Sequence, residues 1–315
     1  MGARPSEPRP RFRRVHGVRF TIALPTDRVE HASEFVTGDA IATCARAAED
    51  AGFDSCFVTD HPAPDSRWLA AGGHHALDPF VALSFAAAAT TTLRVQTHIL
   101  VLPYRNPLLT AKAVLSLDVL SGGRVILGVA SGYLKPEFAA LGVDFDTRNE
   151  LTDEAIDVMR RVWTEDDVAF EGRTFRTRGT TMAPRPVQRP HPPIWIGGNS
   201  KVAMRRAVER GQGWVPFPNP GGAAMSAVRT PEMSTFEQLE SRMAMLRQFA
   251  DEAGRLEPLD VCFSPLAARP TIDDLQRLED VGVTWCVLGV GRVATRREYV
   301  DAVRRLGDEV VGAYR

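Results

Sequence analysis

Short apolar runs alternate with longer segments of helical periodicity along the chain from Val18 onward. The run RFTIAL (19–24) is rich in β-branched and apolar residues and predicts a strand. The segment DAIATCARAAEDA (39–51) follows with the spacing of an amphipathic helix, and Asp39 and Gly52 are its expected cap and stop. Strands that alternate with helices in this way are typical of a parallel sheet.

The same alternation continues to the end of the chain. Further strands are expected at 55–61, 93–102, 124–132, 194–198, 213–217, 259–265 and 285–290. Helices are expected at 78–90, 108–121, 149–164, 201–210, 235–253, 271–282 and from 295 onward, with Asp78 and Asn106 as caps before prolines. Eight strands and eight helices in alternation predict an α/β fold of the (β/α)8 or TIM-barrel type. A doubly wound open sheet is the alternative, but no G-x-G-x-x-G follows the first strand.

Three segments depart from this rhythm. Residues 165–193 contain FEGRTFR, which favours a small strand pair, and then the proline-dense APRPVQRPHPP. Residues 218–233 are rich in glycine, proline and small side chains and predict a mobile loop. Residues 1–17 form a basic, proline-punctuated leader that we expect to be disordered, because the apolar stretch after it is too short for a signal peptide. The remaining residues, 18–315, are expected to form one barrel domain.

The composition argues against some kinds of binding partner and indicates the cellular compartment. The 38 basic and 39 acidic residues nearly cancel, so no global field draws the chain to nucleic acid or to an anionic membrane. No apolar run is long enough to span a bilayer. The four cysteines, Cys44, Cys56, Cys262 and Cys286, lie far apart, which argues against a zinc site or a disulfide framework and favours core thiols of a cytoplasmic protein. We therefore expect no metal.

Polar residues at the carboxyl ends of the expected strands are the candidate site, because the loops of a barrel converge there. The strand ends carry Asp60 and His61, Thr97 and His98, Ser131 and Gly132, and Gly197 to Asn199. His61 has the ring type of a general acid or base, and a structural salt link with a neighbouring carboxylate is its plain alternative. His98 lies in an apolar strand and needs either a polar pocket or a buried partner. His74 and His75 have no third ligand in view and are expected in a surface loop.

The segment IWIGGNSK suggests a binding site for an anion. A strand stops at Gly197 and Gly198, and a helix is expected to begin at Asn199 or Ser200. Backbone N–H groups at such a helix start, unobstructed by side chains at the glycines, favour a phosphate. A tight structural turn is the alternative.

Taken together, these motifs resemble the luciferase-like oxidoreductase family, whose members bind a flavin or the deazaflavin coenzyme F420 in a (β/α)8 barrel. The similar pieces run in order from AEDAGFDSCFVTDH through RVQTHILVLPYRNPLLTAKAVLSLDVLSGGRVILGVASGYLKPEFAALGVDF to APRPVQRPHPPIWIGGNS. The run from Gly132 through Leu134, Glu137 and Phe138 to Gly142 is most similar to the deazaflavin-using branch.

The resemblance implies a role for each matching position. His61 and Asp60 would lie beside the redox ring, with His61 as proton donor or orienting group. Thr97, His98 and Ile99 would form a bulge behind the ring, often with a non-prolyl cis peptide, and Gly197, Gly198, Asn199 and Ser200 would hold the phosphate end. Asn106, Ser131 and Gly132 are further cofactor-binding positions. The expected substrate pocket comprises Trp68, Tyr133, Trp214 and Phe217 beside the 218–233 loop. Tyr133 stands where some deazaflavin reductases carry an acidic residue.

These positions imply hydride transfer between coenzyme F420 and a small organic substrate. The alternative is an FMN-dependent monooxygenase that uses reduced flavin and dioxygen, and a third reading is a barrel that has lost its cofactor. The resemblance also implies a homodimer.

Overall fold

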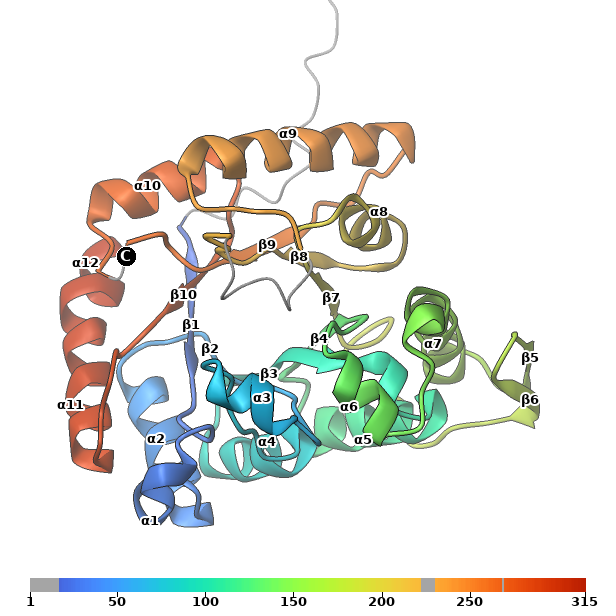
Figure 1. The fold of residues 1–315 in the computed structure, drawn as a ribbon, viewed down its shortest axis with the longest axis horizontal. Coiled ribbons are helices and arrows are strands. Elements are labelled where there is room, and N and C mark those ends of the chain that lie inside the picture. Colours follow the sequence, from blue (N-terminus) through green and yellow to red (C-terminus); the bar gives the residue numbers. More distant parts are fainter. Residues whose placement is uncertain (1–16, 222–229, 268) are drawn as a thin grey trace, which may run out of the picture.

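The computed structural model describes residues 17–221, 230–267 and 269–315. Within them, eight parallel strands close into a barrel, which confirms the predicted (β/α)8 architecture (Figure 1). Closure comes from the first and last strands, since Arg19 pairs with Trp285, and this excludes an open sheet. The barrel order is β1 (Arg19–Ala23), β2 (Ser55–Val58), β3 (Arg94–Val101), β4 (Val125–Ala130), β7 (Ile194–Gly197), β8 (Gly213–Val215), β9 (Asp260–Phe263) and β10 (Trp285–Leu288). The leader up to residue 16 and residues 222–229 of the expected mobile loop lie outside the described residues.

The long helices surround the barrel (Figure 1). They are α2 (Gly38–Asp50), α4 (Pro79–Ala89), α5 (Pro107–Leu120), α7 (Arg148–Thr164), α8 (Lys201–Arg210), α9 (Phe236–Glu252), α10 (Ile272–Val281) and α11 (Arg296–Leu306). Short helical elements occupy several loops and the C-terminus: η1 (Val29–His31), α1 (Ala32–Phe35), α3 (Ser66–Ala70), η2 (Leu102–Tyr104), α6 (Lys135–Ala140), η3 (Phe145–Thr147), the π-helix η5 (Gly307–Val311) and α12 (Gly312–Tyr314). None of the helices in the described ranges is long and apolar enough to cross a membrane.

Local side chains explain where several helices begin. Asp78 and Asn106 cap α4 and α5 through their side-chain oxygens, each ahead of a proline, as predicted. The cap predicted for α2 was wrong. Thr37, not Asp39, accepts the N–H of Ala40, so the helix starts at Gly38 and Asp39 lies in its first turn.

The excursion between α7 and β7 contains the expected strand pair. Strands β5 (Val168–Glu171) and β6 (Arg176–Thr180) form an antiparallel two-stranded sheet. In Figure 1 this hairpin lies at the outer edge of the molecule, beyond α7. It therefore adds a layer outside the barrel and takes no part in barrel closure.

The strands of the barrel bury both faces. Residues such as Phe20, Ile22 and Leu127 pack outward in the main core with the helices, whereas Ile126 and Trp285 belong to a separate cluster. This two-sided burial explains why strands such as RVILGVA read as continuous apolar runs. All four cysteines are buried and unpaired, as core thiols should be.

Strand β3 carries a bulge where the site is expected. Its register against β4 shifts between Thr97 and Leu100, and the His98–Ile99 peptide is cis, so both features implied by the family resemblance are present. The bulge brings the Thr97 carbonyl over β4, where a Cβ on Gly128 would lie 2.2 Å from that oxygen. Only glycine fits at this position, because the Thr97 carbonyl belongs to the backbone and cannot move aside as a flexible side chain could.

We predict that Gly128→Ala destabilises the fold by about 2 kcal/mol or more, since overpacking of this size forces backbone shifts. Urea unfolding measures the change. Gly289→Ala is the matched control, because a Cβ at Gly289 meets nothing within 4 Å. Equal stability of the two variants would contradict the proposed contact.

Candidate functional site

The carboxyl ends of the strands form the mouth of the barrel, and His61 lies there beside a buried carboxylate. Nδ1 of His61, three residues after the end of β2, lies 3.1 Å from Oε2 of Glu137 in α6. The Ala63 amide donates to the other carboxylate oxygen at 2.9 Å, and the Tyr104 hydroxyl donates to Oε2 at 3.0 Å. Donors from two loops, after β2 and after β3, thus meet one carboxyl group that lies after β4.

The charge state of Glu137 follows from these contacts. Its side chain is fully buried, which by itself would raise the pKa. The hydrogen bonds from His61, Ala63 and Tyr104 outweigh burial, so the pKa of Glu137 lies below its ordinary value. The carboxyl group is therefore ionised at neutral pH and acts only as an acceptor.

Aromatic side chains surround the His61 ring. Trp68 lies 4.4 Å from it between ring centroids, and His74 lies 4.9 Å away edge-on. The Tyr133 hydroxyl approaches Nε2 of His61 at 3.5 Å. Trp68 and Tyr133, two of the expected substrate-pocket residues, thus lie beside the predicted catalytic histidine. His74 and His75 lie in a loop with His75 exposed, as expected, but the His74 ring turns inward and packs against His61.

Asp60 faces away from the imidazole of His61. One oxygen accepts the Val101 amide at 3.0 Å and the other accepts Arg105 at 2.8 Å. Arg105 also pairs with Asp78 at the start of α4. These contacts join β2 to the end of β3, so the structure places Asp60, predicted to be catalytic, in a positioning network.

His98 lies on the inner face of the barrel below the mouth. Its ring packs on Phe57 with 4.4 Å between ring centroids, and Gln96 Nε2 donates to its Nδ1 at 3.1 Å. Burial lowers the pKa of His98 to about 4, so the ring is neutral at neutral pH. The structure therefore supplies the buried partner that the sequence required.

Small residues keep the floor of the mouth open beside His98. A Cβ on Gly197 would come within 3.1 Å of Ile99, so a side chain here would press against the bulge. Thr97 points elsewhere, because its hydroxyl donates to the Gly128 carbonyl at 2.7 Å. Of the three predicted bulge residues, His98 and Ile99 retain exposed area at the floor and Thr97 is buried.

The turn after β7 has the form expected of an anion site. Gly198 adopts a left-handed φ of 117°, and Ser200 caps α8 by accepting the Ala203 amide. Asn199 is fully buried, where its amide side chain bonds both the N–H and the carbonyl of Phe217 and also the Pro231 carbonyl. Asn199 thus fastens the loop that follows β8, and its own N–H donates to the Thr230 hydroxyl at 3.1 Å.

A buried arginine organises the end of β4. Arg206 of α8 pairs with Asp153 of α7 at 2.6 Å and donates to the Ser131 hydroxyl at 3.0 Å. Ser131 in turn donates to Asn149. Next to it, Gly132 has φ 76° and packs against Phe138, which leaves no room for a side chain. Ser131 is therefore held by protein groups on two sides.

Three of the predicted site residues make contacts that stabilise the fold. The Asn106 side chain caps α5, which leaves its oxygen bonded to Leu108 and Leu109. Trp214 points outward into the helical layer, fully buried, and its indole N–H donates to the Gly198 carbonyl. Phe217 is partly buried beside Asn199. The structure thus places Trp214 in the core instead of at the mouth.

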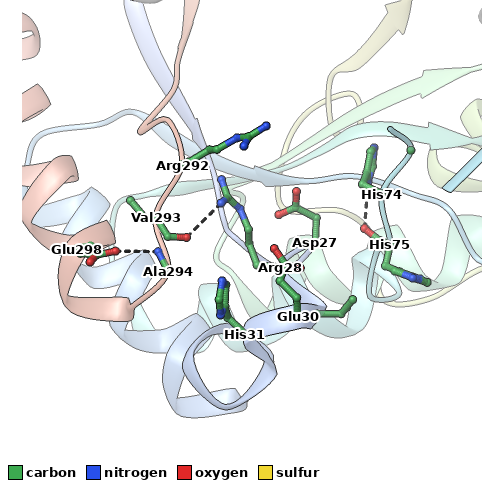
Figure 2. Close-up of a pocket in the computed structure, with 12 residues that line it drawn as sticks. Asp27, Arg28, Glu30, His31, His74, His75, Arg292, Val293, Ala294 and Glu298 are labelled. Carbon is green, nitrogen blue, oxygen red and sulfur yellow. Dashed lines mark hydrogen bonds between the residues drawn. The ribbon is translucent and has the colours of Figure 1, made fainter. Parts of the chain in front are cut away.

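A cavity of about 600 Å³ opens beside His74, whose ring packs against His61. Figure 2 shows the loop after β1 on one side, the loop after β10 on another, and His74 and His75 opposite. Arg28 joins the first two loops by donating to the carbonyls of Gly291 and Val293. Charged side chains such as Asp27, Arg28 and Arg292 therefore line this cavity together with apolar ones such as Val29 and Val293.

Glu137, Tyr104 and Arg105 are the site residues that motif reasoning missed. Glu137 was noted only as part of the run that resembles the deazaflavin branch. The sequence contains one local signal, because the acidic Glu137 lies next to the apolar Phe138. In the structure both side chains are buried. The partner of Glu137 lies 76 positions away, so spacing along the chain could not reveal the pair.

Comparison with known proteins gives the family. Residues 18–279 match the luciferase-like monooxygenase family. A Mycobacterium tuberculosis protein, Rv0940c, is 32% identical over 257 residues, covering 78% of this chain and 83% of its own length. The chain therefore belongs to the luciferase-like family of F420- or flavin-dependent oxidoreductases and monooxygenases, which confirms the expectation of an enzyme.

Two further relatives differ in cofactor. The F420-dependent glucose-6-phosphate dehydrogenase of Intrasporangium calvum is 36% identical over 176 residues, 53% of this chain and 50% of the relative. The FMNH2-dependent dimethylsulfone monooxygenase of Pseudomonas putida is 35% identical over 167 residues, 52% of this chain and 44% of the relative.

Solved structures share the fold. The F420-dependent tetrahydromethanopterin reductase of Methanopyrus kandleri superposes with a TM-score of 0.71 at 19% identity, covering 95% of this chain and 100% of that one. Monooxygenase RslO1 of Streptomyces bottropensis gives 0.73 at 21% identity with the same coverage.

The neutral, half-buried ring of His98 predicts a pH dependence of stability. A folded-state pKa of about 4 lies below the ordinary histidine value of about 6.5, so stability is complete above about pH 6.5 and is lost as pH falls toward 4. We expect the wild type to lose about 2 kcal/mol more than His98→Gln between about pH 7 and pH 5. Urea unfolding of both proteins at the two pH values tests this, and parallel losses would contradict it.

Proposed function

We propose that this enzyme transfers a hydride between coenzyme F420 and a small organic substrate, with His61 exchanging the accompanying proton. The observation that carries the proposal is His61 at the barrel mouth, paired with a buried, ionised Glu137. The similarity of Gly132–Gly142 to the deazaflavin-using branch supports the choice of cofactor, as does the F420-dependent relative.

The residues present fit a flat ring with a phosphate tail. Gly128 and Gly197 lie below the mouth, and Gly197 stands where a Cβ would press on Ile99. At the start of α8, the N–H groups of Gly198, Asn199 and Ala203 bond to Val215, Thr230 and Ser200, so a phosphate would use those of Lys201 and Val202. The bulge at His98 and Ile99 and the turn at Gly198 would hold the two ends of the cofactor.

The chemistry divides between cofactor and protein. When bound, F420 would supply a carrier of two electrons in the form of a hydride. In the direction of oxidation, the substrate carbon loses a hydride and the substrate hydroxyl gives its proton to His61. In the direction of reduction, His61 returns that proton to the carbonyl oxygen. Trp68 and Tyr133 exclude water around the ring of His61.

The cavity beside His74 is the proposed entry for the substrate. It adjoins His61 through the His74 ring, and Asp27 and Arg292 both line it. A mixed-charge lining of this kind suits a polar substrate that presents hydrogen-bonding groups, since an apolar one would leave these charges desolvated.

Binding of F420 tests the cofactor. Titration of the purified protein with F420 and, separately, with FMN is expected to give tight binding of F420 and weaker binding of FMN. An FMN-dependent monooxygenase is the second candidate, favoured by the similarity to the dimethylsulfone enzyme. Binding of FMN alone, with oxygen consumed during turnover, would replace the F420 proposal by that candidate.

We predict that His61→Ala lowers turnover of an F420-linked substrate about a hundredfold, the usual contribution of a positioned acid or base. F420 affinity is expected to change little, because His61 is not among the groups proposed to hold the cofactor. Steady-state kinetics measure the first quantity and equilibrium titration the second. Unchanged turnover would remove His61 from the mechanism.

We also propose that the enzyme is a homodimer through the outer faces of α4 and α5. Val81 and Phe85 are at least half exposed one turn apart on α4, and Leu109 and Leu120 are more exposed still on the neighbouring α5. Exposed apolar side chains on two adjacent helices suit an interface.

Phe85→Arg is expected to convert the dimer to a monomer, because a charge would have to be buried without a partner. Sedimentation velocity measures the change. Val202→Arg on α8 is the matched control, since Val202 is similarly exposed but lies on another helix. A monomeric wild type would refute the proposed interface.

A further inference from the structure

Two residues behind His61 determine which of its ring nitrogens exchanges the proton. We propose that Glu137 and Tyr104 are positioning residues that hold hydrogen on Nδ1 of His61 and leave Nε2 as the reactive atom. The functional meaning of this assignment rests on the proposed role of His61. The assignment itself depends only on contacts within the protein.

Because Glu137 and His61 are both buried, the hydrogen bond between them cannot be replaced by one to water. The Glu137 side chain is 0% exposed and His61 is 8% exposed, so water cannot take the place of the protein donors. An ionised carboxylate is only an acceptor, and the atom that it faces at 3.1 Å is Nδ1. Nδ1 must therefore carry the hydrogen. A carboxylate in this position holds an imidazole in one tautomer and stabilises its protonated form.

The second nitrogen is free to react. A neutral imidazole has one donor and one acceptor, so a hydrogen on Nδ1 leaves a lone pair on Nε2. Nε2 faces the Tyr133 hydroxyl at 3.5 Å, beyond a strong hydrogen bond. Nε2 therefore accepts a proton from the substrate side, and once protonated it is the only nitrogen that can return it.

Tyr104 stabilises the negative charge of the Glu137 carboxylate. Its hydroxyl shares Oε2 of Glu137 with His61 Nδ1, and thereby spreads the negative charge over two donors at one oxygen. Burial and the adjacent Glu137 raise the pKa of Tyr104 far above its ordinary value, so the hydroxyl keeps its proton and remains a donor. Tyr104 thus stabilises the ionised carboxylate and does not compete for the proton on His61.

Other ionisable groups near the ring do not replace Glu137. Within residues 17–221, 230–267 and 269–315, the titratable and charged groups that contact the His61 ring or its partners are Glu137, His74, Tyr104, Tyr133 and the neighbouring Asp60 with its partner Arg105. Burial lowers the pKa of His74 and raises that of Tyr133 to about 12, so both are neutral at neutral pH. Asp60 is bonded to Val101 and Arg105 and makes no hydrogen bond to the ring.

The test is the tautomer of His61, read by long-range proton–nitrogen NMR on protein labelled with ¹⁵N-histidine. No cofactor or substrate is added, so the result is independent of the proposed function. Spectra are recorded at about pH 9, well above the ordinary imidazole pKa of about 6.5. The missing signal in His61→Gln identifies the resonances of His61. We expect a protonated Nδ1 and an unprotonated Nε2 in the wild type.

Glu137→Gln keeps the shape of the side chain and removes its charge. We expect the ratio of the Nδ1–H to the Nε2–H form to fall about 10- to 100-fold, the loss of one hydrogen bond to a charged group. Tyr104→Phe and Tyr133→Phe retain the carboxylate and are expected to leave the Nδ1–H form dominant. Tyr133→Phe is the matched control, because it removes a hydroxyl from the opposite side of the same ring.

Two results would overturn the assignment: a dominant Nε2–H form in the wild type, or an unchanged ratio in Glu137→Gln. If Glu137→Gln does not fold, the wild-type spectrum alone still decides the first point. A purely structural role for Glu137 would alter stability but not the tautomer of a folded variant. Turnover is the second readout: Glu137→Gln is expected to lower kcat more than it changes KM.

Discussion

The site is organised around the buried negative charge of Glu137, which has no access to water and needs donors from the chain. Those donors come from the loops after β2 and β3, at His61, Ala63 and Tyr104. Glu137 itself lies after β4. One carboxylate therefore joins three neighbouring strand ends, and the same contacts that satisfy it also orient the imidazole. Orientation of the His61 ring and cohesion of the mouth have a single physical cause.

Next to this charge, the bulge of β3 shapes the floor. Gly128 is a glycine because the Thr97 carbonyl approaches it, and the register shift at His98 and Ile99 turns those residues toward the mouth. The neutral state of His98 follows from burial. The mouth thus contains two imidazoles: that of His61 is paired with the charged Glu137, and that of His98 is not paired with a charge.

The predicted substrate-pocket residues separate in the structure. Trp68 and Tyr133 lie beside His61. Trp214 instead packs in the helical layer, because successive residues of a strand face opposite sides and its neighbours Gly213 and Val215 take the inner positions. The loops after β1 and β10, which contain no family motif that we used, supply the charged lining.

The sequence by itself determined the order of strands and helices, the caps at Asp78 and Asn106, and the strand ends that carry polar residues, because these depend on periodicity and on contacts a few residues apart. It also indicated His61, since a titratable ring at a strand end is a local feature. Only the tertiary structure decided what each of these side chains faces. The partners of His61, Asp60 and Ser131 lie on other strands and helices, and a pairing between distant positions leaves no periodic trace in the chain. For the same reason, the contact of Glu137 with His61 could not be predicted from the sequence, because it forms only when barrel closure brings β2, β3 and β4 side by side.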